Sequence, residues 1–121
     1  MSSFKALAEL EPITLAPGIT ARSVEGERMT VAVVDLAPNA VSPEHAHENE
    51  QIGFVIRGSM TMRIGNEVLE LHPGDTYVIP SHVEHGAAAG PEGASVTDIF
   101  VPIREDWKTK DRLDPTKPDW P

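Results

Sequence analysis

The chain has 121 residues and no cysteine, which supports one domain and excludes disulfides, thiolate metal sites and cysteine nucleophiles. Its formal net charge is −9, and because an acidic surface repels nucleic-acid phosphates and anionic lipid, no nucleic-acid or membrane partner is expected. No apolar run approaches the length of a membrane span and the N-terminus lacks the apolar core of a signal peptide, so a cytoplasmic location is predicted.

Eleven prolines and nine glycines are spread along the chain and bound short apolar segments, a pattern typical of an all-β domain. Residues 3–10 predict at most one or two helical turns, and the first strand is predicted over residues 28–36. Further strands are predicted over residues 51–57, 60–64, 67–71, 76–79, 83–89 and 95–101. With the turn signals between them, these segments predict an antiparallel sandwich or barrel of about eight strands.

The C-terminal segment has a different composition. Residues 105–121 are polar, contain three prolines and are predicted to form an extended tail. Trp107 and Trp120 are expected to pin this tail to the barrel or to a second subunit. The prediction is therefore a single domain over residues 1–121, with the barrel core at about 19–104 and the tail at 105–121.

Two of the five histidines form a His-x-His pair. On an extended segment, His45, His47 and Gln51 have the same parity and point to one face, where two imidazoles and an amide oxygen can bind one divalent ion. Glu48 and Glu50 have the opposite parity and are expected to be solvated. The alternative is that the histidines bind nothing, because a lone His-x-His pair often occurs by chance.

The other three histidines follow later in the chain. His82 and His85 come after a turn and a strand, where another strand could cross the same cavity. His85 is either a further ligand or a histidine at the barrel mouth without metal, and the role of His82 is left open. His72 precedes a proline in a turn, which favours a structural role.

Two segments carry a resemblance to a known family. Residues 45–58 (HAHENEQIGFVIRG) resemble the first cupin motif, G-x5-H-x-H-x3,4-E-x6-G. Residues 74–85 (GDTYVIPSHVEH) resemble the second cupin motif, G-x5-P-x-G-x2-H-x3-N. Two motifs in this order imply an antiparallel jelly-roll barrel. By position, the resemblance implies the metal ligands His45, His47, Gln51 and His85.

The sequence differs from the two cupin motifs at four positions. Asn39 stands where the leading glycine of the first motif falls, His82 replaces the glycine of the second, and Ala89 replaces its asparagine. Gln51 occupies the glutamate position. Because imidazoles and an amide leave a divalent ion with its full charge, Lewis-acid chemistry is favoured over oxygen activation. The ligand set allows a divalent transition metal such as Ni, Zn, Fe, Mn or Co.

A second group of candidate catalytic and binding residues follows the motifs in the sequence. Asp98 shares parity with Phe100, but both faces of this predicted strand carry apolar residues, so either can face the interior. If it points inward, Asp98 is a candidate general base, and Arg104 can present a bidentate fork to a carboxylate. The alternatives are that Asp98 pairs with a surface lysine or caps a turn, and that Arg104 pairs with Glu105 or Asp106.

The ending D-x-F-x-P-x-R-E-D at residues 98–106, together with both motifs, resembles the small cupins of pectin degradation. That group converts 4,5-unsaturated monouronates into linear ketouronates at a His/His/Gln/His metal site. The resemblance covers residues 28–106 and implies that Asp98 removes a proton, Arg104 holds the carboxylate of a sugar acid and Phe100 packs on its ring. It also implies a homodimer, with the N-terminal strands and the tail as candidate interfaces. The alternatives are a cupin oxygenase or another metal-assisted enzyme, and a non-catalytic sugar- or metal-binding barrel.

Overall fold

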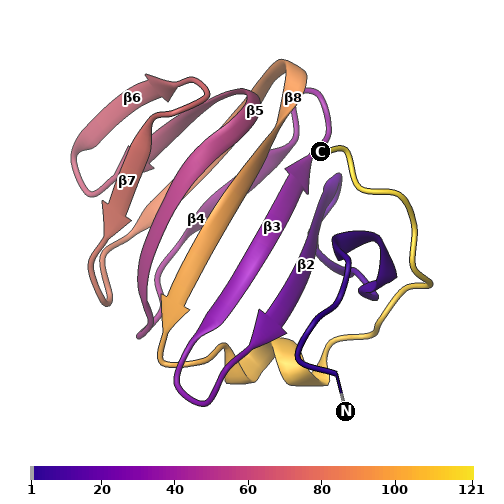
Figure 1. Cartoon of the computed structure of the whole chain (residues 1–121). Helices are drawn as coiled ribbons and strands as arrows, with labels where there is room; N and C mark the ends of the chain where they lie inside the picture. The colour runs from indigo at the N-terminus through magenta and orange to yellow at the C-terminus, as the bar shows by residue number, and fades with distance from the viewer. Residues whose placement is uncertain (1) are drawn as a thin grey trace.

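A computed structural model describes residues 2–121, and strands dominate this part of the chain (Figure 1). The elements in chain order are the 3₁₀ helix η1 (Leu7–Glu9), the strands β1 (Ile13–Ala16), β2 (Ile19–Glu25), β3 (Thr30–Leu36), β4 (Val41–His45), β5 (Glu50–Ile64), β6 (Glu67–Leu71), β7 (Thr76–Ile79) and β8 (His85–Val101), and the 3₁₀ helix η2 (Glu105–Thr109). Within residues 2–121, neither helix has the length and apolarity needed to cross a bilayer.

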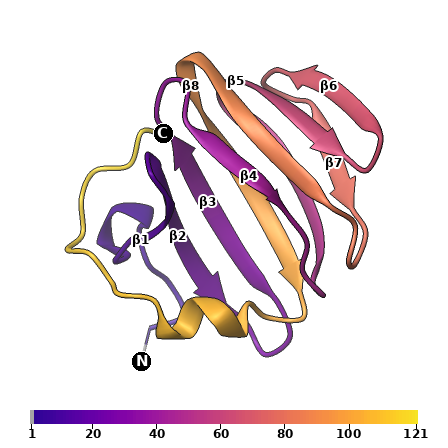
Figure 2. The same ribbon diagram turned by 180° about the vertical axis from the view of Figure 1, so that it is seen from behind.

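All strand pairs are antiparallel, and two long strands join the two sides of a barrel. One side runs β1-β2-β3-β8-β5-β7, and the other runs β4-β8-β5-β6. β5 and β8 therefore belong to both sides, pairing with each other along most of their length. Figures 1 and 2 show these two strands curving from one side to the other. The predicted all-β jelly-roll barrel is confirmed.

The prediction of four separate short strands in place of β5 and β8 is wrong, and two glycines explain why. Gly58 and Gly93 have positive φ values of 71° and 79°, a backbone region that side chains disfavour. A Cβ on Gly58 would collide with the carbonyl oxygen of Gly93, so the two backbones touch there. These glycines, which resemble turn signals in the sequence, bend continuous strands from one sheet into the other.

Three strands were not predicted. β1 and β2 precede the predicted first strand, and β4 lies inside a segment whose polarity resembles a loop. β4 pairs only with β8 and is exposed along most of its length, so it does not need alternating apolar residues. Its proline is compatible with such an edge position.

The tail is not extended throughout, because its first residues form η2. Trp107 in η2 is 2% exposed and packs into the barrel, whereas Trp120 is 38% exposed. From η2 the chain runs back along the outside of the barrel to the end of β3 (Figure 1, yellow). The backbone N–H of Leu113 donates to Pro12 O at 2.8 Å, and Pro118 is buried.

The tail covers a buried ion pair on the outer face of the first sheet. Arg22 Nη1 lies 3.2 Å from Asp35 Oδ2, and both side chains are buried. Asp35 also accepts hydrogen bonds from Ser95 Oγ at 2.7 Å and from the Asp119 backbone N–H at 3.1 Å. Arg22 Nη2 donates to the backbone oxygen and hydroxyl of Thr116 at 3.0 and 2.7 Å. The charges of this pair are thus matched.

Candidate metal centre

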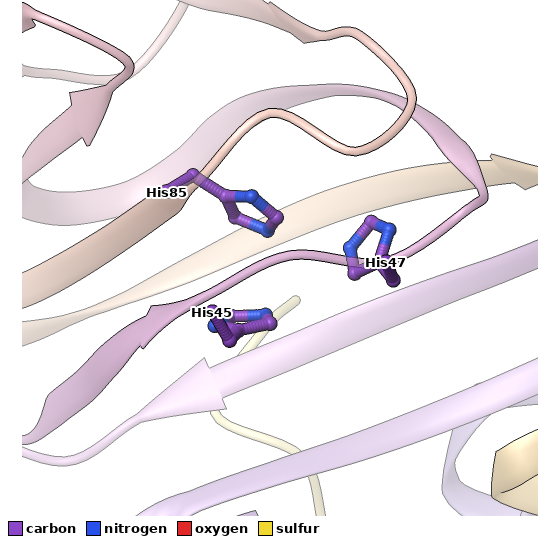
Figure 3. A group of neighbouring side chains, drawn as sticks. All are labelled: His45, His47 and His85. Atoms are coloured by element: carbon purple, nitrogen blue, oxygen red, sulfur yellow. The ribbon is translucent and has the colours of Figure 1, made fainter.

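Three histidines converge inside the barrel (Figure 3). His45 ends β4, His47 lies in the following loop and His85 begins β8, where it pairs in register with His45. One ring nitrogen from each histidine lies within 4.8 Å of the others. His85 is buried, His47 is half-buried and His45 is exposed, so the group is reached from one side.

The second ring nitrogen of each histidine is held by the backbone. Each Nδ1 faces a carbonyl oxygen two residues away in the sequence, and each oxygen accepts a hydrogen bond from a protonated Nδ1. The acceptors are Pro43 O for His45 (2.8 Å), Asn49 O for His47 (3.0 Å) and Val83 O for His85 (2.9 Å). This arrangement places the proton on Nδ1 and leaves the Nε2 lone pairs for a ligand.

The charge state of the histidines suits metal binding. Burial lowers the pKa of His85 to about 4, and the neighbouring His45, His47 and Arg104 charges act in the same direction. Burial also lowers the pKa of His47, followed by the effect of Arg104. Both imidazoles are therefore neutral at pH 7, which is the form that binds metal ions.

Gln51 completes the donor set. Its side chain is 6% exposed, and its Oε1 lies 3.2 Å from His47 Nε2. An unprotonated Nε2 and a carbonyl oxygen both present lone pairs, so their approach is unfavourable unless a cation lies between them. The residues present therefore fit a divalent metal ion, with imidazole nitrogens and one amide oxygen as donors.

A cavity of about 340 Å³ extends from the histidines into the barrel. Of the seven residues predicted to form the site, all but His47 line the cavity. These residues are His45, Gln51, His85, Asp98, Phe100 and Arg104. Asp98 thus points inward, together with Phe100, while Ile99 and Val101 on the opposite parity are 36% and 43% exposed.

Asp98 is a buried carboxylate without an ion-pair partner within 4.0 Å among residues 2–121. It is 5% exposed, and the Tyr77 hydroxyl donates to its Oδ1 at 2.6 Å. Burial raises the pKa of Asp98, an effect opposed by Tyr77, by Gln51 and by the charge of Arg104. A buried carboxylate with a raised pKa is a stronger base than an exposed one, which suits it to proton transfer in a cavity.

Arg104 lies at the same cavity, but one edge of its guanidinium group forms a bidentate ion pair with Asp106. Nε and Nη2 donate to the two Asp106 oxygens at 3.0 and 2.8 Å, so the alternative pairing with Asp106 is the one in the structure. The guanidinium carbon lies 4.8 Å from the Phe100 ring centre and 4.5 Å from that of Trp107. The two rings meet edge to face, with centres 5.1 Å apart, and the guanidinium lies over both of them, within cation–π distance. Nη1 is the nitrogen left for a further anion.

The remaining histidines and acids lie outside this cavity. His82 is exposed with a φ of 65°, and Asn39 has a φ of 62°. Both positions correspond to motif glycines, so the backbone keeps the left-handed conformation although the residues differ. Glu48 and Glu50 are exposed, and exposed His72 lies 3.4 Å from Glu70.

Sequence reasoning did not select Tyr77, the partner of Asp98. A signal was present, because Gly53 interrupts an apolar strand, and an isolated glycine there often marks a close approach. Gly53 pairs with Tyr77 on one side and with Asp98 on the other. Trp107 was expected only to anchor the tail, yet it also forms the platform for Arg104.

Comparison with known proteins points to one family. Residues 32–100 match the Cupin_2 family, described as the cupin domain. KdgF from Halomonas sp. is 33% identical over 88% of this chain and 98% of that chain, with a TM-score of 0.79. An RmlC-like cupin from Shewanella frigidimarina NCIMB 400 is 25% identical over 88% of this chain and 96% of that chain, with a TM-score of 0.81. The sequence has no match among curated proteins.

A more distant structure shares the fold. Oxalate decarboxylase of Bacillus subtilis, which has Mn(II) centers, is 22% identical over 90% of this chain and 32% of that chain, with a TM-score of 0.75. A jelly-roll barrel whose three converging histidines fit a metal ion places this chain among small β-barrels with a candidate metal centre. The match over residues 32–100 shows that the chain belongs to the cupin family.

Proposed function

We propose that the protein is a metal-dependent enzyme that opens the ring of 4,5-unsaturated monouronates and forms linear ketouronates. The observation that carries this proposal is the buried carboxylate of Asp98, which has no ion-pair partner among residues 2–121 and lines the same cavity as His45, His85 and Arg104. The resemblance of residues 28–106 to the pectin-degradation cupins and the 33% identity to KdgF support it.

His45, His47 and His85, with Gln51, would hold a divalent transition metal such as Ni, Zn, Fe, Mn or Co through Nε2 atoms and an amide oxygen. When bound, such an ion supplies Lewis-acid polarisation of a substrate oxygen. The protein orients this donor set in advance, because backbone carbonyls fix the ring of each histidine.

Arg104 and Phe100 would bind the sugar acid. The chain has a net charge of −9, which repels an anionic substrate, so a local cation at the cavity is required. Arg104 provides it, with Nη1 available to the substrate carboxylate while Asp106 holds the other edge. Phe100 presents an apolar ring surface within the cavity, against which the sugar ring packs.

Asp98 would accept the proton of the anomeric hydroxyl. As that O–H bond breaks, a C=O bond forms at carbon 1, and the bond from carbon 1 to the ring oxygen breaks with its electron pair remaining on the oxygen. The resulting enolate is protonated at carbon 4 and becomes the ketone, so substrate and product have the same composition. The raised pKa of Asp98 makes its carboxylate a stronger base than an exposed aspartate.

The experiment incubates metal-loaded protein with unsaturated galacturonate and follows loss of the ring-alkene absorbance against the spontaneous rate. We expect an acceleration that a chelator abolishes and that re-added metal restores. A rate equal to the spontaneous one, with metal still bound stoichiometrically, would overturn the proposed reaction and leave the metal centre intact.

The proposal includes a homodimer, as the resemblance implies. A row of apolar side chains crosses the outer face of the first sheet, following the register of β2, β3, β8, β5 and β7. Its exposed members are Val24 (48%), Ile99 (36%), Ile52 (46%) and Val78 (54%). Such a row favours packing of a second copy. Sedimentation equilibrium of the protein and of Ile52→Glu tests it, because the charge would shift a dimer to monomers.

A further inference from the structure

Tyr77, Gly53 and Asp98 form one row across three neighbouring strands. Gly53 in β5 pairs with Tyr77 in β7 and with Asp98 in β8. The Tyr77 hydroxyl spans this row and donates to Asp98 Oδ1 at 2.6 Å. Tyr77 and Asp98 are both buried, at 6% and 5% exposure, and both line the cavity.

The glycine between them makes this contact possible. A Cβ on Gly53 would overlap Asp98 Oδ1 and would lie 2.5 Å from the Tyr77 hydroxyl oxygen. Any residue other than glycine at this position would push the two side chains apart or distort β5. The Tyr77–Asp98 hydrogen bond therefore depends on an empty position in the middle strand.

The contact distinguishes the two oxygens of Asp98. A buried hydroxyl donor to Oδ1 restricts rotation of the carboxyl group, because rotating it would leave the Tyr77 hydroxyl without its acceptor. Tyr77 does not engage Oδ2, although Gln51 also donates to this carboxyl group, so Oδ2 is the oxygen that we assign to the substrate proton. A carboxylate held in one orientation reacts faster than one that rotates freely.

We propose that Tyr77 is a positioning residue: through its hydrogen bond over Gly53, it holds the Asp98 carboxyl so that Oδ2 receives the substrate proton. This inference rests on the proposed function. Tyr77 itself neither binds metal nor transfers a proton to the substrate. Its ring also packs in the barrel core, so its hydroxyl must be tested separately from its ring.

The first test is kinetic and uses Tyr77→Phe, which keeps the ring and removes only the hydroxyl. We expect kcat to fall by about 10- to 100-fold, with KM and bound metal unchanged. In an Asp98→Asn background, the same change should have no further effect, because Tyr77 acts through Asp98. The matched control is Ser95→Ala, which removes another hydroxyl that donates to a buried aspartate, Asp35, on the outer face.

The second test needs no activity. Tyr77 is the only tyrosine, so protein labelled with ¹³C at the tyrosine Cζ gives a single resonance. We expect this resonance to shift in Asp98→Asn and to stay in place in Ser95→Ala. A resonance that does not respond to Asp98→Asn would show that the contact is absent in solution and would overturn the inference.

The outcomes separate the two proposals. If the wild-type protein accelerates the reaction but Tyr77→Phe keeps the wild-type kcat, the positioning role is overturned while the proposed function stands. If Tyr77→Phe loses bound metal, Tyr77 supports the metal centre and the proposed role is likewise overturned. If the wild-type protein gives no acceleration, the proposed function fails, and with it this role of Tyr77.

Discussion

Two buried aspartates in this protein accept a hydrogen bond from a hydroxyl, one on each face of the same sheet. Asp35 on the outer face lies against Arg22 and accepts from Ser95 and the tail backbone. Asp98 on the inner face accepts from Tyr77, and its pKa is raised by burial. Among residues 2–121, Asp35 lies within ion-pair distance of a cation, whereas Asp98 does not and only feels the charge of Arg104 from farther away.

The two aspartates show how the same residue type can have a structural role on one face of a sheet and a proposed catalytic role on the other. A matched, enclosed charge is stable and inert, since removing either partner leaves a buried charge without compensation. An unmatched carboxylate at a cavity costs stability and is retained where it reacts with something. Asp35 anchors the C-terminal tail, whereas Asp98 faces the space that a substrate would enter.

Asp98→Asn removes the charge of the aspartate on the inner face. If Asp98 is the general base, turnover of the unsaturated uronate should fall by about 10²- to 10⁴-fold, while bound metal is unchanged. Because the variant removes an unmatched buried charge, its thermal midpoint should equal or exceed that of the wild type. The measurements are the alkene absorbance assay, metal analysis and thermal unfolding; undiminished turnover would remove Asp98 from the mechanism.

The reciprocal change is Asp35→Asn. It leaves the Arg22 guanidinium buried without a counter-ion, so the free energy of unfolding should fall by about 3–5 kcal/mol. Activity per folded molecule should be unchanged, because Asp35 lies on the other face of the sheet. Urea unfolding and the same activity assay measure the two effects. Loss of activity with unchanged stability would contradict the assignment of a structural role to Asp35 and a catalytic role to Asp98.

The histidines of the candidate metal centre predict that the stability of the metal-free protein depends on pH. The pKa of His85 lies at about 4 in the folded protein against an ordinary value of 6.5. Between these values the unfolded chain binds a proton that the folded chain does not, so stability of the metal-free protein should fall as pH decreases through this window. Urea unfolding across the window measures it, and His85→Gln should flatten the dependence. An equal slope in both proteins would contradict the assignment.

The smallest expected effect concerns the left-handed residues outside both regions. His82→Gly relieves a non-glycine residue at a φ of 65°, but glycine also gains freedom in the unfolded chain. The net stabilisation should therefore be about 1 kcal/mol or less. Thermal unfolding of His82→Gly, with Asn39→Gly as the parallel case, measures it. A clear destabilisation would indicate that the His82 side chain has a role of its own.

The barrel and the converging histidines could be predicted because their signals are local. Short segments bounded by glycine and proline indicate strands, and the His-x-His spacing indicates a shared site, although His47 lies in a loop and not on the extended segment that the parity argument assumed. The bends in β5 and β8 could not be separated from turns, since a glycine at positive φ serves both. The direction of Asp98 was also undetermined, because the opposite face of its strand is apolar and exposed, as Ile99 shows.

The partners of the site residues depend on register, which a single sequence does not specify. The Tyr77–Asp98 contact joins strands that are neighbours only through β5, and it requires Gly53 to lie between them. Asp106 was weighed as a partner of Arg104, but the stacking of Trp107 on that guanidinium depends on how η2 folds back. Such contacts follow from packing rather than from local pattern.

β8 carries His85 at its first residue and both Asp98 and Phe100 near its end. One continuous strand therefore sets the distance between a proposed metal ligand and the proposed catalytic carboxylate. A single residue inserted between Gly93 and Asp98 would turn every later side chain to the opposite face and place the carboxylate outside the barrel. An insertion in the turn at Gly65 and Asn66 would leave this spacing intact. We therefore expect the proposed site to tolerate length changes in the turns and not in β8.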